Sequence, residues 1–165
     1  GDAAAFEILY AKHKGPLYRY LLRQCGSRDS TDELFQDVWM KLIQGRAHYQ
    51  VKAKFTTYLY TIARHRLIDH YRKQGDSSFD NDTEVDEING REQDQPHKRM
   101  ELQQQAAQLL AAIAGLPALQ RDALLLKEEA GMSLAEIATL TGVNTETVKS
   151  RLRYAIKKLH QVIKL

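Results

Sequence analysis

A segment near the C-terminal end, residues 133–154, carries side chains that could bind duplex DNA. Cations pair with phosphates, while hydroxyl, carboxylate and guanidinium groups can hydrogen-bond to base edges. Outward positions at the start of its second predicted helix are of these types: Thr145, Glu146, Lys149, Ser150 and Arg153. Further positive charge along the same helix comes from Arg151, Lys157 and Lys158. Most charged helix faces are merely solvated, but the motif around these residues favours a DNA-binding surface.

A second group of candidate binding residues lies in the first half of the chain, at residues 41–73. This stretch holds one acidic residue, Asp69, and eight basic ones: Lys41, Arg46, Lys52, Lys54, Arg64, Arg66, Arg72 and Lys73. Interleaved with them are aromatic residues: Tyr49, Phe55, Tyr58, Tyr60 and Tyr71. Because cations bind phosphates and unstacked bases lie on aromatic rings, the mixture suits single-stranded or melted DNA. Taken singly, each aromatic residue is better explained as core, whereas the basic loop 46–54 favours nucleic acid.

The predicted helix before this stretch has the opposite surface. Acidic and polar residues line one side of it: Asp32, Glu33, Gln36 and Asp37. Acidic residues in the first turn of a helix interact with its dipole, which explains Asp32 and Glu33 without any partner. Asp37 lies too far along the helix for that explanation. An acidic stripe beside a basic segment therefore suggests a protein partner on one side and DNA on the other.

A predicted helix-turn-helix positions the C-terminal candidates. A capping box at Ser133–Glu136 begins its first helix, and Asn144 begins its second. Gly142 suits the turn between them, because a positive φ costs glycine little. The two helices are expected at 133–141 and 144–164, with Ile137, Ala138, Val148 and Leu152 facing inward. This order and size are typical of a DNA-binding helix-turn-helix.

The apolar spacing is helical elsewhere too, with no alternating stretch typical of a half-buried strand. Gly15-Pro16 is expected to end one helix and begin the next, and a capping box at Ser30–Glu33 to begin a third. Further helices are expected at 3–12, 55–73, 98–114 and 117–130, and glycines 26, 45, 115, 131 and 142 punctuate the pattern. We predict an all-α protein with two small helical domains, residues 1–75 and 98–165.

The net charge of +3 conceals three blocks of different sign. Residues 1–75 carry 13 basic and 7 acidic side chains, residues 76–100 carry 3 and 8, and residues 101–165 carry 8 and 6. The middle block has few sizeable apolar residues, which is too little burial to offset chain entropy. We therefore expect residues 76–97 to be a flexible acidic linker between two basic domains.

Composition excludes several classes of protein. The one cysteine, Cys25, cannot form an internal disulfide or a cysteine-based zinc site, and no apolar run approaches the roughly 20 residues of a membrane-spanning helix. The six histidines are scattered, and no phosphate-binding glycine loop or nucleophile motif occurs. We expect a cytoplasmic protein that is not an enzyme and binds no cofactor or metal, with Cys25 buried or incidental.

Several stretches together resemble bacterial RNA polymerase sigma factors of the extracytoplasmic-function (ECF) class. Residues 1–10 (GDAAAFEILY), 32–39 (DELFQDVW) and 55–69 resemble the first conserved domain of that family. Residues 116–124 (LPALQRDAL) and the helix-turn-helix ending in 147–152 (TVKSRL) resemble the second. Both matches follow the family's order, with a variable linker between them, so the resemblance covers nearly the whole chain.

The resemblance implies a role for each group of candidate residues. Asp32, Glu33, Gln36 and Asp37 match the helix that docks on the clamp coiled coil of the largest polymerase subunit. The loop at 46–56 and the helix that follows match the surface that captures a flipped base and melts the minus-10 element, here Arg46, Tyr49, Lys52, Lys54, Phe55, Tyr58 and Arg64. The recognition helix for the minus-35 element corresponds to Thr145, Glu146, Thr147, Lys149, Ser150, Arg151, Arg153 and Lys157.

The family also implies partners. They are core RNA polymerase, promoter DNA and an anti-sigma factor that sequesters both domains, while the acidic linker would run toward the RNA exit path. This sequence departs from the family pattern at His65, where asparagine is common, and in the loop 50–54 (QVKAK), which is often richer in Gly and Ser. The base preference of relatives therefore does not transfer. The chain starts at the family's Gly-Asp dipeptide, which leaves room for a short native leader before Gly1.

The main alternative is a repressor or activator that binds duplex DNA without polymerase. It explains residues 133–158 equally well, but it leaves the acidic stripe and the basic aromatic stretch without a function. A promoter-specificity subunit uses all three, since two tethered small domains can read two DNA elements with an affinity that neither has alone. Such a protein should bind promoter duplex poorly when free of polymerase.

Overall fold

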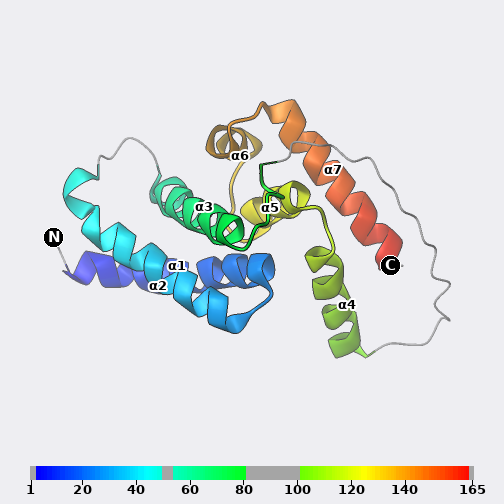
Figure 1. The fold of residues 1–165 in the computed structure, drawn as a ribbon, viewed down its shortest axis with the longest axis horizontal. Helices are drawn as coiled ribbons and strands as arrows, with labels where there is room; N and C mark the ends of the chain where they lie inside the picture. The colour runs from blue at the N-terminus through cyan, green and yellow to red at the C-terminus, as the bar shows by residue number, and fades with distance from the viewer. Residues whose placement is uncertain (1–2, 50–53, 81–100, 164–165) are drawn as a thin grey trace.

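The computed structural model describes residues 3–49, 54–80 and 101–163, and every regular element in these ranges is a helix. The elements are α1 (Ala3–Cys25), α2 (Arg28–Gln44), the short 3-10 helix η1 (Arg46–His48), α3 (Phe55–Lys73), α4 (Leu102–Ala114), α5 (Ala118–Glu128), α6 (Leu134–Thr141) and α7 (Thr145–Val162) (Figure 1). The predicted all-α class is confirmed. No helix in the described ranges has the length and apolar character needed to cross a membrane.

Helices α1, α2 and α3 pack against one another and form the N-terminal half. Apolar residues spaced by three or four positions face the centre of this bundle, among them Leu17, Leu21, Val38, Leu59 and Leu67, all fully buried. Aromatic rings from α1 and α2 extend the core toward the start of α1, where the ring centroids of Tyr10 and Trp39 lie 4.9 Å apart. The predicted helix over 55–73 is confirmed.

Two predicted helix boundaries in this half are wrong. Helix α1 runs without a break through Gly15-Pro16, although Pro16 has no N–H to donate to the preceding turn. The buried side chains of Leu17, Tyr20 and Leu21 hold the second part of α1 in the bundle, which outweighs one missing hydrogen bond.

Helix α2 begins at Arg28 and not at the predicted capping box at Ser30–Glu33. Ser27 is the N-cap, and its hydroxyl oxygen accepts a hydrogen bond from the Ser30 N–H. The earlier start buries Thr31, whose hydroxyl donates to the Ser27 carbonyl at 2.7 Å. Ser27, which caps the helix and accepts the hydrogen bond of the buried Thr31, therefore determines where α2 starts.

The C-terminal half contains α4 to α7, and α7 contacts the other three helices. The predicted capping box of α6 is confirmed, because Ser133 and Glu136 each accept the expected backbone hydrogen bond. Asn144 caps α7, and Gly142 adopts φ 72°, as the turn requires. The helix-turn-helix core is apolar, with Leu126, Ile137, Val148, Leu152 and Ala155 buried.

The two halves pack against each other. Helices α4 and α5 contact α1, and α6 contacts α3 (Figure 1). The first residues of the segment expected to be a linker also pack on the N-terminal half: Phe79 is buried, with its ring centroid 5.2 Å from that of Tyr71. Residues 81–97 of the predicted linker lie outside the described residues.

Candidate nucleic-acid interface

The first part of α7 presents polar and cationic side chains to solvent. Thr145, Glu146, Lys149, Arg153 and Lys157 are exposed, and Thr147 and Ser150 are half-buried. The Asn144 side chain accepts hydrogen bonds from both the backbone N–H and the hydroxyl of Thr147, at 2.8 and 2.9 Å. These contacts fix the start of α7, from which DNA-binding helices of this motif read bases.

Arg151 does not share this open surface. Its residue exposure is 7%, and it lies on the face of α7 that also buries Val148, Leu152 and Ala155. Arg151 comes three positions after Val148 and four before Ala155, so it lies on the same face of the helix as these two buried residues. Arg151 therefore adds its charge to α7 from the buried face and not from the exposed one.

Candidate minus-10 residues on the N-terminal half are partly open and partly packed. Arg46 and Lys54 are exposed, at either end of a segment whose residues 50–53, including Lys52, lie outside the described ranges. The ring centroids of Tyr49 and Tyr58 lie 4.7 Å apart, and that of Phe55 lies 5.1 Å from the ring of His13. All three aromatic residues are half-buried, and Phe55 and Tyr58 pack against the core.

Arg64 is the member of this group with the most unexpected surroundings. Its Nε lies 2.8 Å from Oδ2 of Asp122 on α5, and the two side chains are 13% and 2% exposed. Burial alone would lower the pKa of Arg64, but the adjacent Asp122 carboxylate raises it above the ordinary value. The guanidinium also lies over the Phe79 ring, 6.0 Å from its centroid. Arg64 is thus held between the two halves of the molecule.

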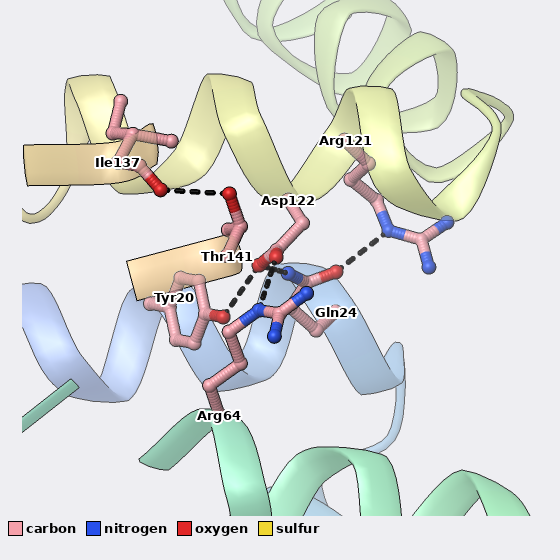
Figure 2. A network of polar contacts seen from close by, with 7 residues as sticks. All are labelled: Tyr20, Gln24, Arg64, Arg121, Asp122, Ile137 and Thr141. Atoms are coloured by element: carbon pink, nitrogen blue, oxygen red, sulfur yellow. Dashed lines mark hydrogen bonds and ion pairs between the residues drawn. The ribbon is translucent and has the colours of Figure 1, made fainter. Parts of the chain in front are cut away.

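Asp122 is the centre of a polar network between the halves (Figure 2). Its Oδ1 accepts hydrogen bonds from the Tyr20 hydroxyl at 2.6 Å and from Gln24 Nε2 at 2.9 Å. Burial and the neighbouring Asp122 carboxylate raise the pKa of Tyr20, which keeps its hydroxyl a donor. The Gln24 side-chain oxygen accepts in turn from Arg121 Nε at 2.8 Å. Three donors from α1 and α3 therefore satisfy one buried carboxylate of α5.

Sequence reasoning missed Asp122, although a signal was present. Residues 116–126 read LPALQRDALLL, so this carboxylate stands in an apolar run where every residue from 122 to 126 is buried. A charged side chain inside a buried helix face requires a partner. Its partners on α1 and α3 are far away in the sequence, so their identity required the structure.

The acidic stripe lies on the outer face of α2. Glu33 and Gln36 are exposed and Asp37 is half-buried, while exposed Asp32 accepts a hydrogen bond from the Tyr18 hydroxyl at 2.7 Å. Met40 and Ile43, with exposures of 54% and 36%, continue the same helix beyond the acidic residues. The exposed apolar side chains beside this polar face are a feature that can mark a protein-binding surface.

Among the described residues, no group of three or more His, Cys, Asp or Glu side chains is arranged to hold a metal ion. Cys25 is half-buried, and burial raises the pKa of its thiol to about 11, so little of it is ionised at neutral pH. This is the environment of a structural cysteine.

Each half of the chain matches a known protein family. Residues 9–76 match the family model of sigma-70 region 2, and residues 106–159 match that of sigma-70 region 4. The ECF RNA polymerase sigma factor RpoE of Cereibacter sphaeroides is 34% identical over 97% of this chain and 87% of its own length. The sigma factor YlaC of Bacillus subtilis is 28% identical over 92% of this chain and 87% of its own length.

A solved structure has the same fold. The sigma factor RpoE of Bartonella quintana, crystallised with the anti-sigma factor NepR, superposes with a TM-score of 0.74 and 23% identity over 98% of both chains.

Proposed function

This chain belongs to the ECF class of the sigma-70 family and directs core RNA polymerase to promoters, and we propose that its candidate residues divide this work between the two halves. The N-terminal domain, residues 1–75, binds polymerase and the minus-10 element. The C-terminal domain, residues 98–165, reads the minus-35 element. The linker 76–97 joins them.

The observation that carries this proposal is the open face of α7. A capped helix-turn-helix presents Thr145, Lys149 and Arg153 to solvent within the region that matches sigma-70 region 4. Hydroxyl and cationic side chains at the start of a recognition helix can contact base edges and phosphates together. Arg151, which is buried, positions α7 in our proposal and does not contact DNA itself.

The N-terminal assignments rest on charge and exposure. Arg46, Lys52 and Lys54 supply cations for the minus-10 strand, and Tyr49, Phe55 and Tyr58 supply rings on which an unstacked base could lie. Glu33, Gln36 and Asp37, together with Asp32, form the polymerase-binding face of α2. Arg64 joins the minus-10 surface once Asp122 no longer holds it.

Two further assignments belong to this proposal. An anti-sigma factor is a fitting regulator, because the superposed relative was crystallised with one. The protein works in the cytoplasm, where core polymerase and promoter DNA are found, and it acts as a binding subunit without enzymatic activity of its own.

Reconstitution with core RNA polymerase tests the division of labour. Wild-type protein should support promoter-dependent run-off transcription, and Asp37→Arg should abolish most of it, because the substitution reverses the charge of the polymerase-binding face. Glu128→Gln, which changes an exposed carboxylate on α5, is the control. Polymerase-independent binding to a duplex operator, unaffected by Asp37→Arg, would instead support a self-sufficient regulator.

A further inference from the structure

Gly45 is the residue at which three elements of the N-terminal half meet. It is the C-cap of α2, where its N–H donates to the Lys41 carbonyl at 2.9 Å. Its own carbonyl accepts from the His48 N–H at 3.0 Å, so the same residue begins η1. Helix α3 packs against α2 and brings the Tyr58 side chain to this point. One glycine therefore fixes where α2 ends and where the chain toward Tyr49 begins.

The lack of a side chain at position 45 leaves room for Tyr58. A Cβ atom on Gly45 would lie 3.0 Å from the Tyr58 hydroxyl oxygen and 3.2 Å from the Lys41 carbonyl oxygen. Non-bonded heavy atoms prefer a separation of about 3.5–4.0 Å, so a larger residue would push the tyrosine away. The backbone itself does not demand glycine, because residues with a side chain also adopt its φ of −85° and ψ of 1°. Glycine is therefore required here for space.

Tyr58 and Tyr49 form an aromatic pair beside this contact. Their ring centroids lie 4.7 Å apart with an interplanar angle of 53°, and both residues are half-buried. The Tyr49 N–H donates to the carbonyl of exposed Arg46 at 3.4 Å, and the Tyr58 N–H donates to that of exposed Lys54 at 3.2 Å. Aromatic rings stack unpaired bases, and cations beside them attract the flanking phosphates. The pair thus has the chemistry to bind single-stranded DNA.

We propose that Gly45 is a positioning residue for DNA, whose bare backbone sets the Tyr49–Tyr58 pair as a stacking surface for one unpaired base of the minus-10 strand. This inference rests on the proposed function of the N-terminal half in minus-10 binding. Gly45 does not contact the base itself. It acts through Tyr58, because the place of that ring against the end of α2 determines its angle to Tyr49 and the ring face left for the base.

A comparison of two strands isolates the stacking surface from the cations around it. Stacking of one base on an aromatic side chain contributes about 1–3 kcal/mol, which is about 5- to 150-fold in affinity at 1.4 kcal/mol per tenfold. Stacking tolerates any base, so oligo-dT is a suitable probe. An abasic strand of the same length carries the same phosphates and has no base to stack. The ratio of the two affinities therefore measures stacking.

The test uses the full chain bound to core RNA polymerase and four variants. Gly45→Ala adds the Cβ atom that crowds Tyr58, and it is made both in the wild-type chain and in a Tyr58→Phe chain, which lacks the crowded hydroxyl but keeps the ring. Gly115→Ala is the matched control, because Gly115 ends α4 at φ −82° and ψ −6° and a Cβ there would lie 3.6 Å from two backbone oxygens, an ordinary contact. Fluorescence anisotropy measures binding of labelled oligo-dT and of the labelled abasic strand.

We expect Gly45→Ala to lower the ratio of oligo-dT affinity to abasic affinity by about fivefold or more in the wild-type chain, because the displaced ring no longer stacks the base. In the Tyr58→Phe chain the same substitution should change the ratio by about twofold or less, because the crowded atom is gone. Gly115→Ala should match the wild type. An unchanged ratio in Gly45→Ala, or an equal loss in both chains, would overturn the inference.

Two controls separate this inference from the proposed function. If wild-type protein gives no promoter-dependent transcript with core polymerase, the proposed function fails, whatever the strand ratios are. If it transcribes but Gly45→Ala leaves the ratio unchanged, only the role of Gly45 fails. Far-UV circular dichroism checks helical content. Should Gly45→Ala alone fail to fold, the combined variant decides the question, since it must fold and stack like Tyr58→Phe if the hydroxyl is the atom that clashes.

Discussion

The open surface of α7 and the covered surface of α3 carry the same kind of side chain in different surroundings. Arg153 is exposed on α7, whereas the Arg64 side chain on α3 is 13% exposed because Asp122 of α5 lies against it. Local sequence gives no hint of this difference, since both arginines lie in basic helices. What separates them is packing between distant segments, so the availability of a cation for DNA is a property of the whole fold.

The largest expected effect compares the two arginines directly. Arg64→Ala should lower the free energy of unfolding by about 3 kcal/mol or more, because it leaves the buried Asp122 carboxylate without its counter-ion. Arg153→Ala should change it by about 0.5 kcal/mol or less, as is usual at exposed positions. Urea unfolding followed by circular dichroism measures both. Equal losses would contradict the difference between the surfaces.

A second prediction reverses the order of the two surfaces by measuring DNA binding through α7. Arg153→Ala should weaken binding of the polymerase complex to a duplex with the minus-35 element by about 1–3 kcal/mol if Arg153 contacts a base. Lys149→Ala should reduce the slope of log binding constant against log salt concentration by about 0.9 if Lys149 contacts one phosphate. Core binding should stay intact. Lys127→Ala, at an exposed cation of α5, is the control. A loss of core binding by Arg153→Ala would refute the separation of roles.

The smallest effect concerns the cap that positions the open surface. Ser133→Ala should lower the free energy of unfolding by about 1 kcal/mol, because it removes the hydroxyl that accepts from the Glu136 N–H. Thermal unfolding at neutral pH measures the change. Ser30→Ala is a matched control, since Ser30 was predicted as a cap and is not one. A greater loss from Ser30→Ala would contradict the observed start of α2.

The same cap predicts a pH dependence. Hydrogen bonds from Ser133, and more weakly the charge of Lys54, lower the pKa of Glu136. A carboxyl group whose pKa is lowered by folding stabilises the fold above its unfolded pKa, and this contribution is lost as pH falls through the folded value. The stability lost in Glu136→Gln relative to the wild type should therefore be full at pH 7 and shrink below about pH 4. A difference that grows in acid would contradict it.

Local patterns predicted the helices of the C-terminal half well. The caps and the turn of the helix-turn-helix depend on contacts between residues close in the sequence. The residue types at Ser133, Gly142 and Asn144 are therefore enough to specify them. The same reasoning went wrong at Pro16, where burial of neighbouring residues holds the helix together, and at Ser30, which competes with an equally good cap at Ser27. Such competitions are decided by tertiary packing.

Only part of the candidate site could be predicted from the sequence, because tertiary packing determines the rest. Exposed positions of α7 follow from helical spacing, but Arg151 falls on the buried face because the register of that helix against its neighbours is set by Val148 and Ala155. The partners of Asp122 come from α1 and α3, with 102 residues between Tyr20 and Asp122 and 58 between Arg64 and Asp122. Single-sequence reasoning has no means of pairing residues at that separation.

Gln24 restricts how this protein can diverge in sequence. Its amide nitrogen donates to Asp122, its amide oxygen accepts from Arg121, and its backbone carbonyl accepts from the Tyr71 hydroxyl. Glutamate would place a second negative charge beside Asp122, and lysine or arginine would offer no acceptor to Arg121. Substitutions at position 24 should therefore arise together with changes at 121 and 122, and a chain that drifts at one of the three must compensate at the others.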